Sequence, residues 1–259
     1  MIPKIIHYCW LSNDKFPLQI QKCIDTWQKV LPDYEFKLWD TNALNLENFI
    51  WVKQAFEAKK YAFAADFIRL YAVYNYGGIY LDCDIEVLKS FNNLLHLPYF
   101  VGSEGNNTIE AGVFGATKGN LWIKNCLEYY NDKTFVNPDG TFNTETLPSI
   151  MIEQVSKTRT IATKSKDEIL QLLKNGDSKT DLYLFSKEYF CAKNLGSGQL
   201  ENTPETYCIH HFAMSWIPFK HQFLANFKRR LMTVFGVKKI TFIINFFNLK
   251  LIKDSFSKK

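Results

Sequence analysis

The first forty residues contain three stretches whose apolar positions repeat with different periods. Lys4–Tyr8 is mostly apolar and follows Pro3, which is typical of a buried strand. From Pro17 to Pro32, apolar residues recur every three or four positions, which predicts a helix with one buried face. Tyr34–Trp39 alternates between apolar and polar residues, as a second strand does. A strand, a helix and a strand in this order predict an α/β fold with a mostly parallel central sheet.

The same kind of alternation continues to about residue 216. Residues 45–76 are expected to be mostly helical. The last helix, in the nearly apolar stretch Tyr61–Tyr76, should stop at Gly77 and Gly78 and lead into the strand Ile79–Asp82. Further strands are expected at Ile85–Leu88, Tyr99–Ser103, Ala111–Ala116, Leu182–Phe185 and Tyr207–His211, and further helices at Leu121–Tyr130 and Leu147–Val155. Since no linker or repeat interrupts this series, we expect residues 1–216 to form a single domain.

Residues 217–259 have a different composition from the rest of the chain. They carry ten Lys or Arg and one acidic residue, for a net charge of +9 in a chain whose total is +5. Apolar residues recur at helical spacing, at Phe219, Phe223, Phe227, Leu231 and Phe235 and again within Ile240–Leu251. This pattern predicts a basic amphipathic helical tail that lies on an anionic membrane surface. The alternative is that the tail packs its aromatic face onto the domain.

The composition narrows the classes of protein. Hydrophobic residues make up 47% and aromatic residues 16% of the chain, enough for a large core. No apolar run approaches the ~20 residues that span a bilayer, and the first residues lack the pattern of a signal peptide. Six dispersed cysteines show no zinc-binding spacing, and we expect free thiols, with Cys83 pointing into the core. We expect a cytoplasmic protein that contacts the membrane peripherally.

Two carboxylates follow the strand that begins after Gly77 and Gly78. Asp82 and Asp84 are two residues apart, so in an extended segment both side chains point to the same side. Like charges this close repel unless a cation lies between them, and hard oxygen ligands suit Mg²⁺ or Mn²⁺. The pair therefore predicts a divalent metal site, although two solvated aspartates in a turn would show the same spacing.

Other polar residues stand out in apolar surroundings. Asp66 and Arg69 share one face of the predicted helix that precedes the aspartates, where they can bind hydroxyl or phosphate groups or simply pair with each other.

His210 and His211 are neighbours on a strand, so at most one of them faces the site, and we favour His211. Ser215 could add an oxygen ligand. Trp216 could form a wall of the pocket.

Taken together, these segments resemble the glycosyltransferase family 32 enzymes, the DXD group of sugar transferases. The resemblance rests on Ile2–Trp10, on Asp66 and Arg69, on Gly77–Asp84, and on His210 and His211 followed by Ser215 and Trp216. It covers about residues 1–216. It implies a GT-A fold, a nucleotide-sugar donor with UDP as the first choice, Mn²⁺ or Mg²⁺, and retention of the anomeric configuration.

The resemblance also implies roles for individual residues. Trp10 would stack near the nucleobase, and Asp66 and Arg69 would contact the donor sugar. Asp82 would contact ribose and sugar hydroxyls, and Asp84 would bind the metal. The residues that bind the metal and the nucleotide-sugar donor would also include His7, Tyr80, His210, His211, Ser215 and Trp216.

The resulting hypothesis is a metal-dependent hexosyltransferase that adds a sugar to a lipid-linked oligosaccharide in capsule or surface polysaccharide synthesis. The first alternative is a metal-dependent phosphoesterase or nucleotide-sugar hydrolase that uses the same carboxylates. The second is a nucleic-acid-binding protein, suggested by the basic tail. Its aromatic residues follow helical spacing and do not form stacking platforms, so we expect no nucleic-acid partner.

Overall fold

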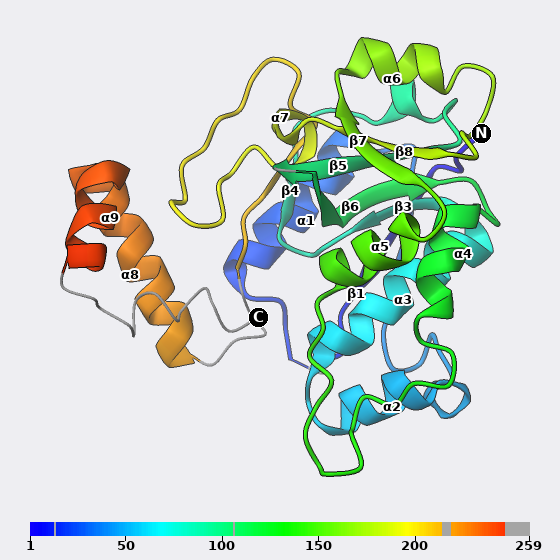
Figure 1. The fold of residues 1–259 in the computed structure, drawn as a ribbon, viewed down its shortest axis with the longest axis horizontal. Helices are drawn as coiled ribbons and strands as arrows, with labels where there is room; N and C mark the ends of the chain where they lie inside the picture. The colour runs from blue at the N-terminus through cyan, green and yellow to red at the C-terminus, as the bar shows by residue number, and fades with distance from the viewer. Residues whose placement is uncertain (13, 106, 214–218, 247–259) are drawn as a thin grey trace.

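The computed structural model describes residues 1–12, 14–105, 107–213 and 219–246, and it has a seven-stranded sheet at its centre (Figure 1). The strand order is β2-β1-β3-β6-β5-β8-β7. The strands are β1 (Ile5–Cys9), β2 (Glu35–Trp39), β3 (Gly78–Leu81), β5 (Tyr99–Gly105), β6 (Thr108–Ala116), β7 (Thr160–Lys164) and β8 (Asp181–Phe185). Neighbouring strands are parallel except where β6 pairs with β3 and β5. The expected α/β fold with a mostly parallel sheet is confirmed, and the reversed direction of β6 is an addition to it.

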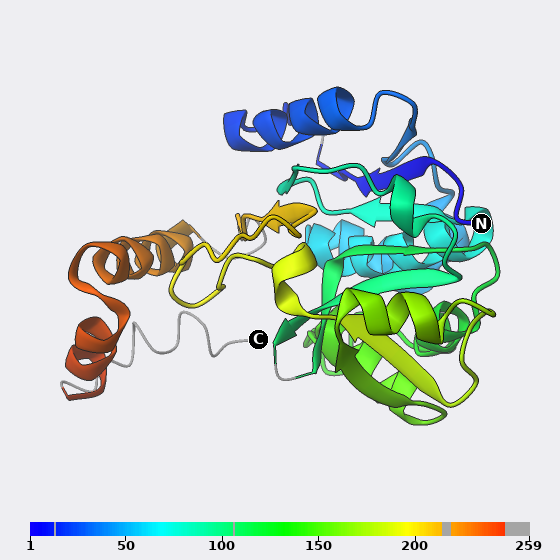
Figure 2. The same cartoon turned by 90° about the horizontal axis from the view of Figure 1, so that it is seen from above.

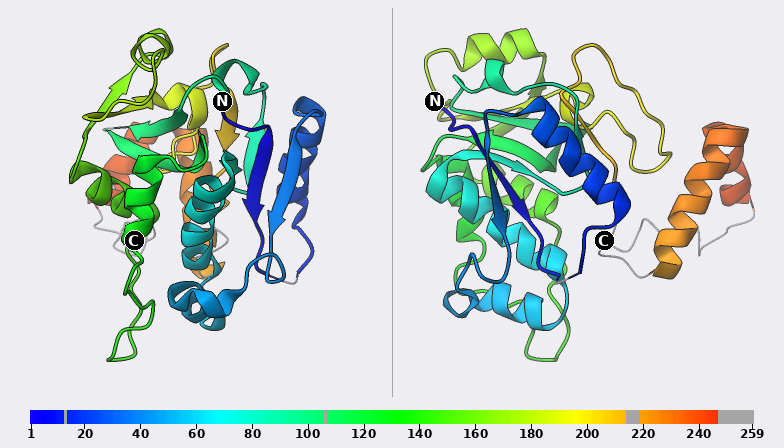
Figure 3. Two further views of the ribbon diagram at one scale, coloured as in Figure 1. Left: turned by 90° about the vertical axis from the view of Figure 1, so that its right-hand side faces the viewer. Right: turned by 180° about the vertical axis from the view of Figure 1, so that it is seen from behind.

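Helices cover both faces of this sheet. They are α1 (Leu18–Val30), α2 (Ile50–Glu57), α3 (Tyr61–Tyr76), α4 (Leu121–Glu128), α5 (Leu147–Ser156), α6 (Lys166–Leu172), α7 (Lys187–Phe190), α8 (Phe219–Phe235) and α9 (Val237–Phe246), with 3-10 turns at Leu46–Asn48 and Asn92–Leu94. Figure 2 and Figure 3 show α1 and α3 on opposite sides of β1 and β2. A second, two-stranded antiparallel sheet pairs β4 (Ile85–Val87) with β9 (Cys208–His210).

The first strand–helix–strand unit forms as its apolar pattern predicts. Pro17 lies at the N-terminal cap of α1, where its fixed φ and missing N–H cost nothing. The predicted face of α1 is buried, and its centre is the fully buried Trp27, whose indole N–H donates to the Ile85 carbonyl at 2.6 Å. This bond ties α1 to the segment that follows the two aspartates.

Three elements were not predicted from the sequence, namely β7, α6 and α7. Strand β7 is an edge strand whose residues are mostly half-exposed, so it lacks the apolar run that marks an inner strand. Helix α6 begins with a capping box in which Ser165 and Glu168 bond to each other's backbone N–H groups. The spacing of Ser165 and Glu168 is a recognised helix-start pattern, and it could have revealed this helix.

The glycine pair before the aspartates is required by both conformation and space. Gly77 has φ of +68° and Gly78 has φ of +108°, a region that other residues avoid. A β-carbon on Gly78 would lie 2.7 Å from the Ile5 carbonyl oxygen, and one on Gly77 would lie 2.9 Å from the Lys118 backbone nitrogen. The pair therefore lets α3 end and β3 start directly beside β1.

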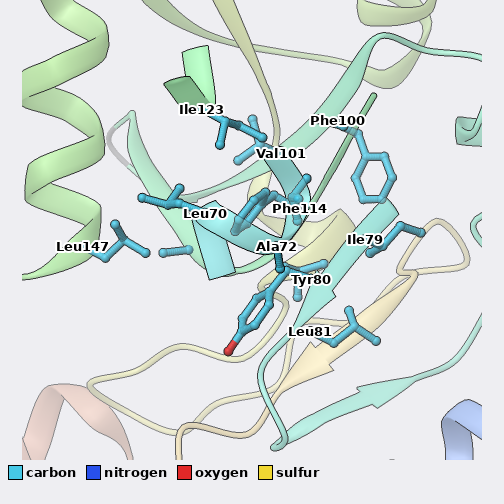
Figure 4. Close-up of a cluster of buried hydrophobic side chains, with 14 of the residues drawn as sticks. Leu70, Ala72, Ile79, Tyr80, Leu81, Phe100, Val101, Phe114, Ile123 and Leu147 are labelled. Atoms are coloured by element: carbon cyan, nitrogen blue, oxygen red, sulfur yellow. The ribbon is translucent and has the colours of Figure 1, made fainter. Parts of the chain in front are cut away.

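The strand that leads to the aspartates is anchored in the core. All four residues of β3 are buried, and Figure 4 shows Tyr80 and Leu81 within the apolar cluster around Phe114. The Cys83 side chain is also buried, as predicted, and its thiol donates to the Cys9 carbonyl. All six cysteines are free thiols. A rigid strand of this kind fixes the direction in which the following turn presents its carboxylates.

His7 belongs to the core, which corrects its expected place in the donor site. Its ring is fully buried, and Nδ1 accepts a hydrogen bond from the Trp39 indole at 3.1 Å. Nε2 therefore carries the proton, and it donates to the Gly77 carbonyl at 2.8 Å. Since both ring nitrogens are used inside the protein, His7 has no free group for a ligand. Adjacent strand residues face opposite ways, and His7 faces inward.

Burial lowers the pKa of His7 from 6.5 to about 4. As the pH falls, His7 therefore binds a proton near pH 6.5 in the unfolded chain but only near pH 4 in the folded chain. The stabilising contribution is complete above pH 6.5 and is lost as the pH falls from 6.5 towards 4, by about 3 kcal/mol in total. Urea unfolding at pH 7 and pH 4.5 should show this loss, and His7→Gln should lose clearly less. Equal losses in the two proteins would contradict the assignment.

The last two described helices project to one side of the body (Figures 1 and 2). On α8, Ala225, Arg229 and Met232 are buried, and Arg229 donates from Nε and Nη1 to the Leu195 and Phe212 carbonyls at 3.0 and 3.2 Å. The tail therefore contacts the domain through this arginine. Among the residues that the structure describes, no helix has both the length and the apolar character needed to cross a membrane.

Candidate metal centre

Three potential metal ligands meet where β3 ends and the small sheet begins. One ligand atom each of Asp82, Asp84 and His210 lies within 4.8 Å of the others. Asp82 and Asp84 share the turn after β3, which an Ile85 N–H to Asp82 carbonyl bond closes at 3.0 Å. His210 joins them because β9 pairs with β4 and places His210 opposite Ile85. The predicted carboxylate cluster is therefore formed, with a histidine from a distant part of the sequence.

Arg69 is the cation that faces these carboxylates from α3. Its guanidinium lies 3.1 Å from Asp66 and 3.2 Å from Asp82, and it donates to the Ala111 carbonyl at 2.9 Å. The Tyr80 hydroxyl donates to the other oxygen of Asp82 at 2.9 Å. Since Tyr80 is buried, this bond fixes the orientation of the Asp82 carboxylate. Burial raises the pKa of Asp66 to about 6, against the attraction of Arg69.

Strand β6 supplies the floor of the site, and its residues were missed from the sequence. Glu110 is fully buried, and its Oε1 accepts from the Gly112 N–H at 2.7 Å and lies 3.1 Å from His210 Nδ1. The Gly112 carbonyl accepts from the Asp82 N–H at 2.8 Å. The sequence clue to Glu110 was a lone acidic residue between the apolar residues of the strand that contains Ala111–Ala116.

The charges of this cluster do not balance. Four carboxylates, Asp66, Asp82, Asp84 and Glu110, surround two cationic groups, Arg69 and His210. Burial alone would lower the pKa of His210, but Glu110 and Asp84 raise it well above its ordinary value. Burial likewise opposes ionisation of Asp84, yet His210 and the Ala213 N–H lower its pKa to about 2. With His210 protonated, two negative charges remain. If His210 binds a metal as a neutral ligand, its proton is released and three remain, of which a divalent cation would offset two.

The two adjacent histidines point in different directions, and this corrects the preference for His211. His210 lies 3.4 Å from Asp84, whereas His211 Nε2 lies 2.7 Å from Glu86 and is outside the ligand cluster. Period-two alternation explains the split, but only the pairing of β9 with β4 decides which histidine faces the aspartates. Ser215 and Trp216, expected to complete the site, lie outside the described residues.

A cavity of about 460 Å³ opens next to the metal cluster. It begins at Ala213, whose backbone N–H donates to Asp84 at 2.7 Å, and extends to Trp10. The indole N–H of Trp10 bonds to the Asp14 carbonyl, which holds the ring in place. The residues that line the cavity are Trp10, Pro17, Gln19, Ile20, Lys193, Gly198, His211, Phe212, Ala213, Arg229, Arg230 and Thr233. The charged groups among them are cationic, so the cavity suits an anionic ligand.

Comparison with known proteins relates part of this site to a known family. Residues 17–101 match the model described as "Glycosyltransferase sugar-binding region containing DXD motif". This region belongs to the DXD-containing glycosyltransferases. It includes four of the site residues, Asp66, Arg69, Asp82 and Asp84, while Glu110 and His210 lie beyond it. Residues 82–84 are the Asp-Cys-Asp that corresponds to the motif in the family's description.

Several curated proteins resemble the DXD region and its surroundings. "Inositol phosphoceramide mannosyltransferase 3" of Schizosaccharomyces pombe is 33% identical over 129 residues, which cover 47% of this chain and 35% of that protein. "Mannosyl phosphorylinositol ceramide synthase CSH1" of Saccharomyces cerevisiae is 29% identical over 52% of this chain and 38% of that protein. The chain thus spans little more than a third of these relatives. "Uncharacterized glycosyltransferase L373" of Acanthamoeba polyphaga mimivirus is 26% identical over 84% of this chain and 85% of its own length.

Solved structures show more distant similarity. The "PaToxG Glycosyltransferase" superposes with a TM-score of 0.46 and 20% identity over 60% of this chain and 68% of that one. The galactosyltransferase LgtC, solved with donor and acceptor sugar analogs, has a TM-score of 0.40 and 10% identity over 80% of this chain and 87% of that one.

Gly112 should be intolerant of any side chain because three groups of the site surround it. A β-carbon there would lie 2.8 Å from Glu110 Oε1, 2.9 Å from Asp82 Oδ2 and 3.0 Å from His210 Cε1. These groups would have to move by a substantial part of an ångström, and such a displacement can cost about 100-fold in rate. We expect Gly112→Ala to fold and to lose 10- to 100-fold of its activity in a sugar-transfer assay.

The matched control is Gly196→Ala, whose β-carbon would meet only Asn194 Oδ1, at 3.4 Å. It should keep wild-type activity. If Gly112→Ala were equally active, the close packing of β6 against the aspartates would not matter for the reaction.

Proposed function

We propose that the chain is a metal-dependent, retaining glycosyltransferase that moves a hexose from a nucleotide sugar, with a UDP-sugar as the first candidate. The observation that carries the proposal is the cluster of Asp82, Asp84 and His210 inside a DXD glycosyltransferase region. Its net negative charge suits a divalent ion, and the imidazole favours a transition metal such as Mn²⁺ over Mg²⁺, which prefers oxygen ligands throughout. Asp82, Asp84 and His210 would hold this ion.

Such an ion, when bound, would offset the charge that develops on the leaving nucleoside diphosphate. The other residues prepare the site for this chemistry. Arg69 holds Asp82 in one orientation while Tyr80 occupies its second oxygen, so the carboxylate enters the reaction without rearrangement. Asp66 lies on the same helix face and is available to accept hydrogen bonds from sugar hydroxyls.

The adjacent cavity supports a place for the nucleoside diphosphate. Lys193, Arg229 and Arg230 bring positive charge to it, and Trp10 offers a flat aromatic surface at the other end. A diphosphate that extended from the metal cluster past Ala213 into the cavity would meet these cations. We therefore assign this cavity to the nucleotide portion of the donor, with Trp10 beside the base.

We further propose a lipid-linked acceptor, in capsule or surface polysaccharide synthesis. The family resemblance makes galactose and glucose the first candidate hexoses. The names of the fungal relatives describe transfer of mannose to inositol phosphoceramide, a lipid, so mannose is a third candidate. Transfer to an acceptor separates this proposal from the nucleotide-sugar hydrolase alternative. Incubation with nucleotide sugars of these three hexoses and membrane lipid extracts, followed by thin-layer chromatography, should show a sugar-labelled lipid. Release of free sugar alone would favour the hydrolase.

The basic tail supports peripheral contact with an anionic membrane. Residues 219–246 carry six Lys or Arg and no acidic residue. On α8, Phe223, Phe227 and Val234 are 59%, 48% and 66% exposed, on the face opposite to the buried Arg229. Exposed apolar side chains among positive charges are typical of helices that insert into the surface of anionic bilayers. A second copy of this chain would present the same positive charge and be repelled.

We expect the full chain to sediment with vesicles of phosphatidylglycerol at low salt and to be released as salt screens the charge. Phe223→Ser combined with Phe227→Ser should weaken vesicle binding at least about tenfold, since each loses a large apolar side chain. Leu121→Ser, which replaces a residue on α4 that is 58% exposed, is the matched control and should bind normally. Binding that ignores the α8 substitutions would contradict the membrane proposal.

A further inference from the structure

The buried Glu110 contacts the Nδ1 side of the His210 ring and is not one of the three clustered ligands. Its Oε1 is 3.1 Å from His210 Nδ1, while the opposite ring nitrogen, Nε2, is 3.4 Å from Asp84. The imidazole therefore bridges Glu110 and Asp84. Of the three clustered ligands, His210 is the one whose side chain bonds to Glu110.

An ionised carboxylate can only accept hydrogen bonds, so Nδ1 of His210 must carry the proton in this contact. The lone pair that binds a metal is then on Nε2, on the side of the aspartates. Histidines that ligate metals usually donate their second N–H to a carboxylate or a carbonyl in this way, which fixes the tautomer and makes the ligand nitrogen more basic. The Gly112 N–H, 2.7 Å from the same Oε1, holds the Glu110 carboxylate in position.

A second contact fixes the plane of the His210 ring. The ring of Phe212 stacks on it with centroids 3.9 Å apart and planes 25° from parallel. Phe212 has φ of +52°, a conformation that is rare for a bulky residue and that costs free energy. In this conformation the Phe212 ring lies over His210, and the Arg229 guanidinium donates to the Phe212 carbonyl. The imidazole is thus held by a carboxylate at its back and by an aromatic ring on its face.

From this geometry we infer that Glu110 is a positioning residue, which selects the His210 tautomer that presents Nε2 to the metal. The inference rests on the metal site of the proposed function and extends it by one residue. Glu110 acts before any donor binds, so removing its charge lowers the affinity of the free enzyme for Mn²⁺. Loss of such a supporting carboxylate typically costs 10- to 100-fold in metal affinity.

The chain provides a matched control in the neighbouring pair of Glu86 and His211. These side chains also form a short contact, 2.7 Å, but His211 is not among the clustered ligands. Mn²⁺ affinity is measured on wild type, Glu110→Gln and Glu86→Gln by electron paramagnetic resonance, without nucleotide or sugar. We expect about tenfold weaker binding for Glu110→Gln, which keeps the shape but loses the charge, and less than twofold change for Glu86→Gln.

The tautomer gives a second readout that a purely structural role would not affect. In Mg²⁺-saturated wild type, the imidazole ¹⁵N shifts of His210 should be those of the Nδ1–H form. Unchanged Mn²⁺ affinity in Glu110→Gln would overturn the inference while leaving the metal site intact. An Nε2–H form in wild type would overturn the inference and would also remove His210 from the proposed ligands. Absence of Mn²⁺ binding to wild type would overturn both this inference and the proposed metal site.

Discussion

Asp84→Asn should lose at least about three orders of magnitude in sugar-transfer rate while remaining folded. Asp84 offers one oxygen to the cluster with Asp82 and His210, and its other oxygen accepts from the Ala213 N–H at 2.7 Å. The asparagine carbonyl can still accept that bond, so the loop keeps its anchor. The variant loses the charge that a divalent ion requires, which removes several kcal/mol of transition-state stabilisation.

The measurement is the initial rate of transfer at saturating donor and Mn²⁺, with circular dichroism as the check on folding. Asp25→Asn, an exposed carboxylate on α1 bonded to Gln21, is the matched control and should keep the wild-type rate. Wild type treated with a chelator should fall to the level of Asp84→Asn. A variant that retains even a tenth of the wild-type rate would contradict the role of Asp84.

Arg69→Met should cause the largest loss of stability among the site variants, about 3–5 kcal/mol in the free energy of unfolding. The guanidinium is buried between Asp66 and Asp82, and removing one partner leaves buried negative charges without compensation. Methionine has a similar apolar volume, so packing changes contribute little. Urea denaturation at pH 8, where Asp66 is ionised, measures the effect.

A second variant separates charge from packing. Adding Asp66→Asn to Arg69→Met removes one of the stranded charges, so the double variant should recover part of the lost stability. If the double variant were as unstable as Arg69→Met, or if the single loss were below 1 kcal/mol, the electrostatic explanation would be wrong.

The parts of the structure that local sequence determines were predictable. The period of apolar residues gave β1, α1 and β2, and a three-residue spacing put Asp66 and Arg69 on one helix face. Asp82 and Asp84 lie in one turn, so their proximity follows from two residues of separation. Each of these features depends on contacts within a few residues, for which backbone geometry alone decides the outcome.

The parts that depend on distant pairing were not predictable from pattern. Glu110 and His210 are one hundred residues apart, and they meet only because the first half of β6 and the end of β9 both lie beside the aspartates. The same pairing made His210 the site residue in place of His211. His7 was assigned to the donor site through the family resemblance of Ile2–Trp10, whereas its hydrogen bonds to Trp39 and Gly77 lie inside the core. No local pattern distinguishes these cases.

The central claim is that Asp82, Asp84 and His210 bind a divalent ion that the chain needs to use a nucleotide sugar. The most direct test is the release of nucleoside diphosphate from a panel of nucleotide sugars by the wild-type chain, titrated with Mn²⁺ after removal of metals. We predict that at least one donor is consumed, that its rate rises from background to saturation with Mn²⁺, and that His210→Ala shifts this titration to higher concentrations. Consumption of a donor at full rate in the presence of a chelator, or of none at any Mn²⁺ concentration, would contradict the claim.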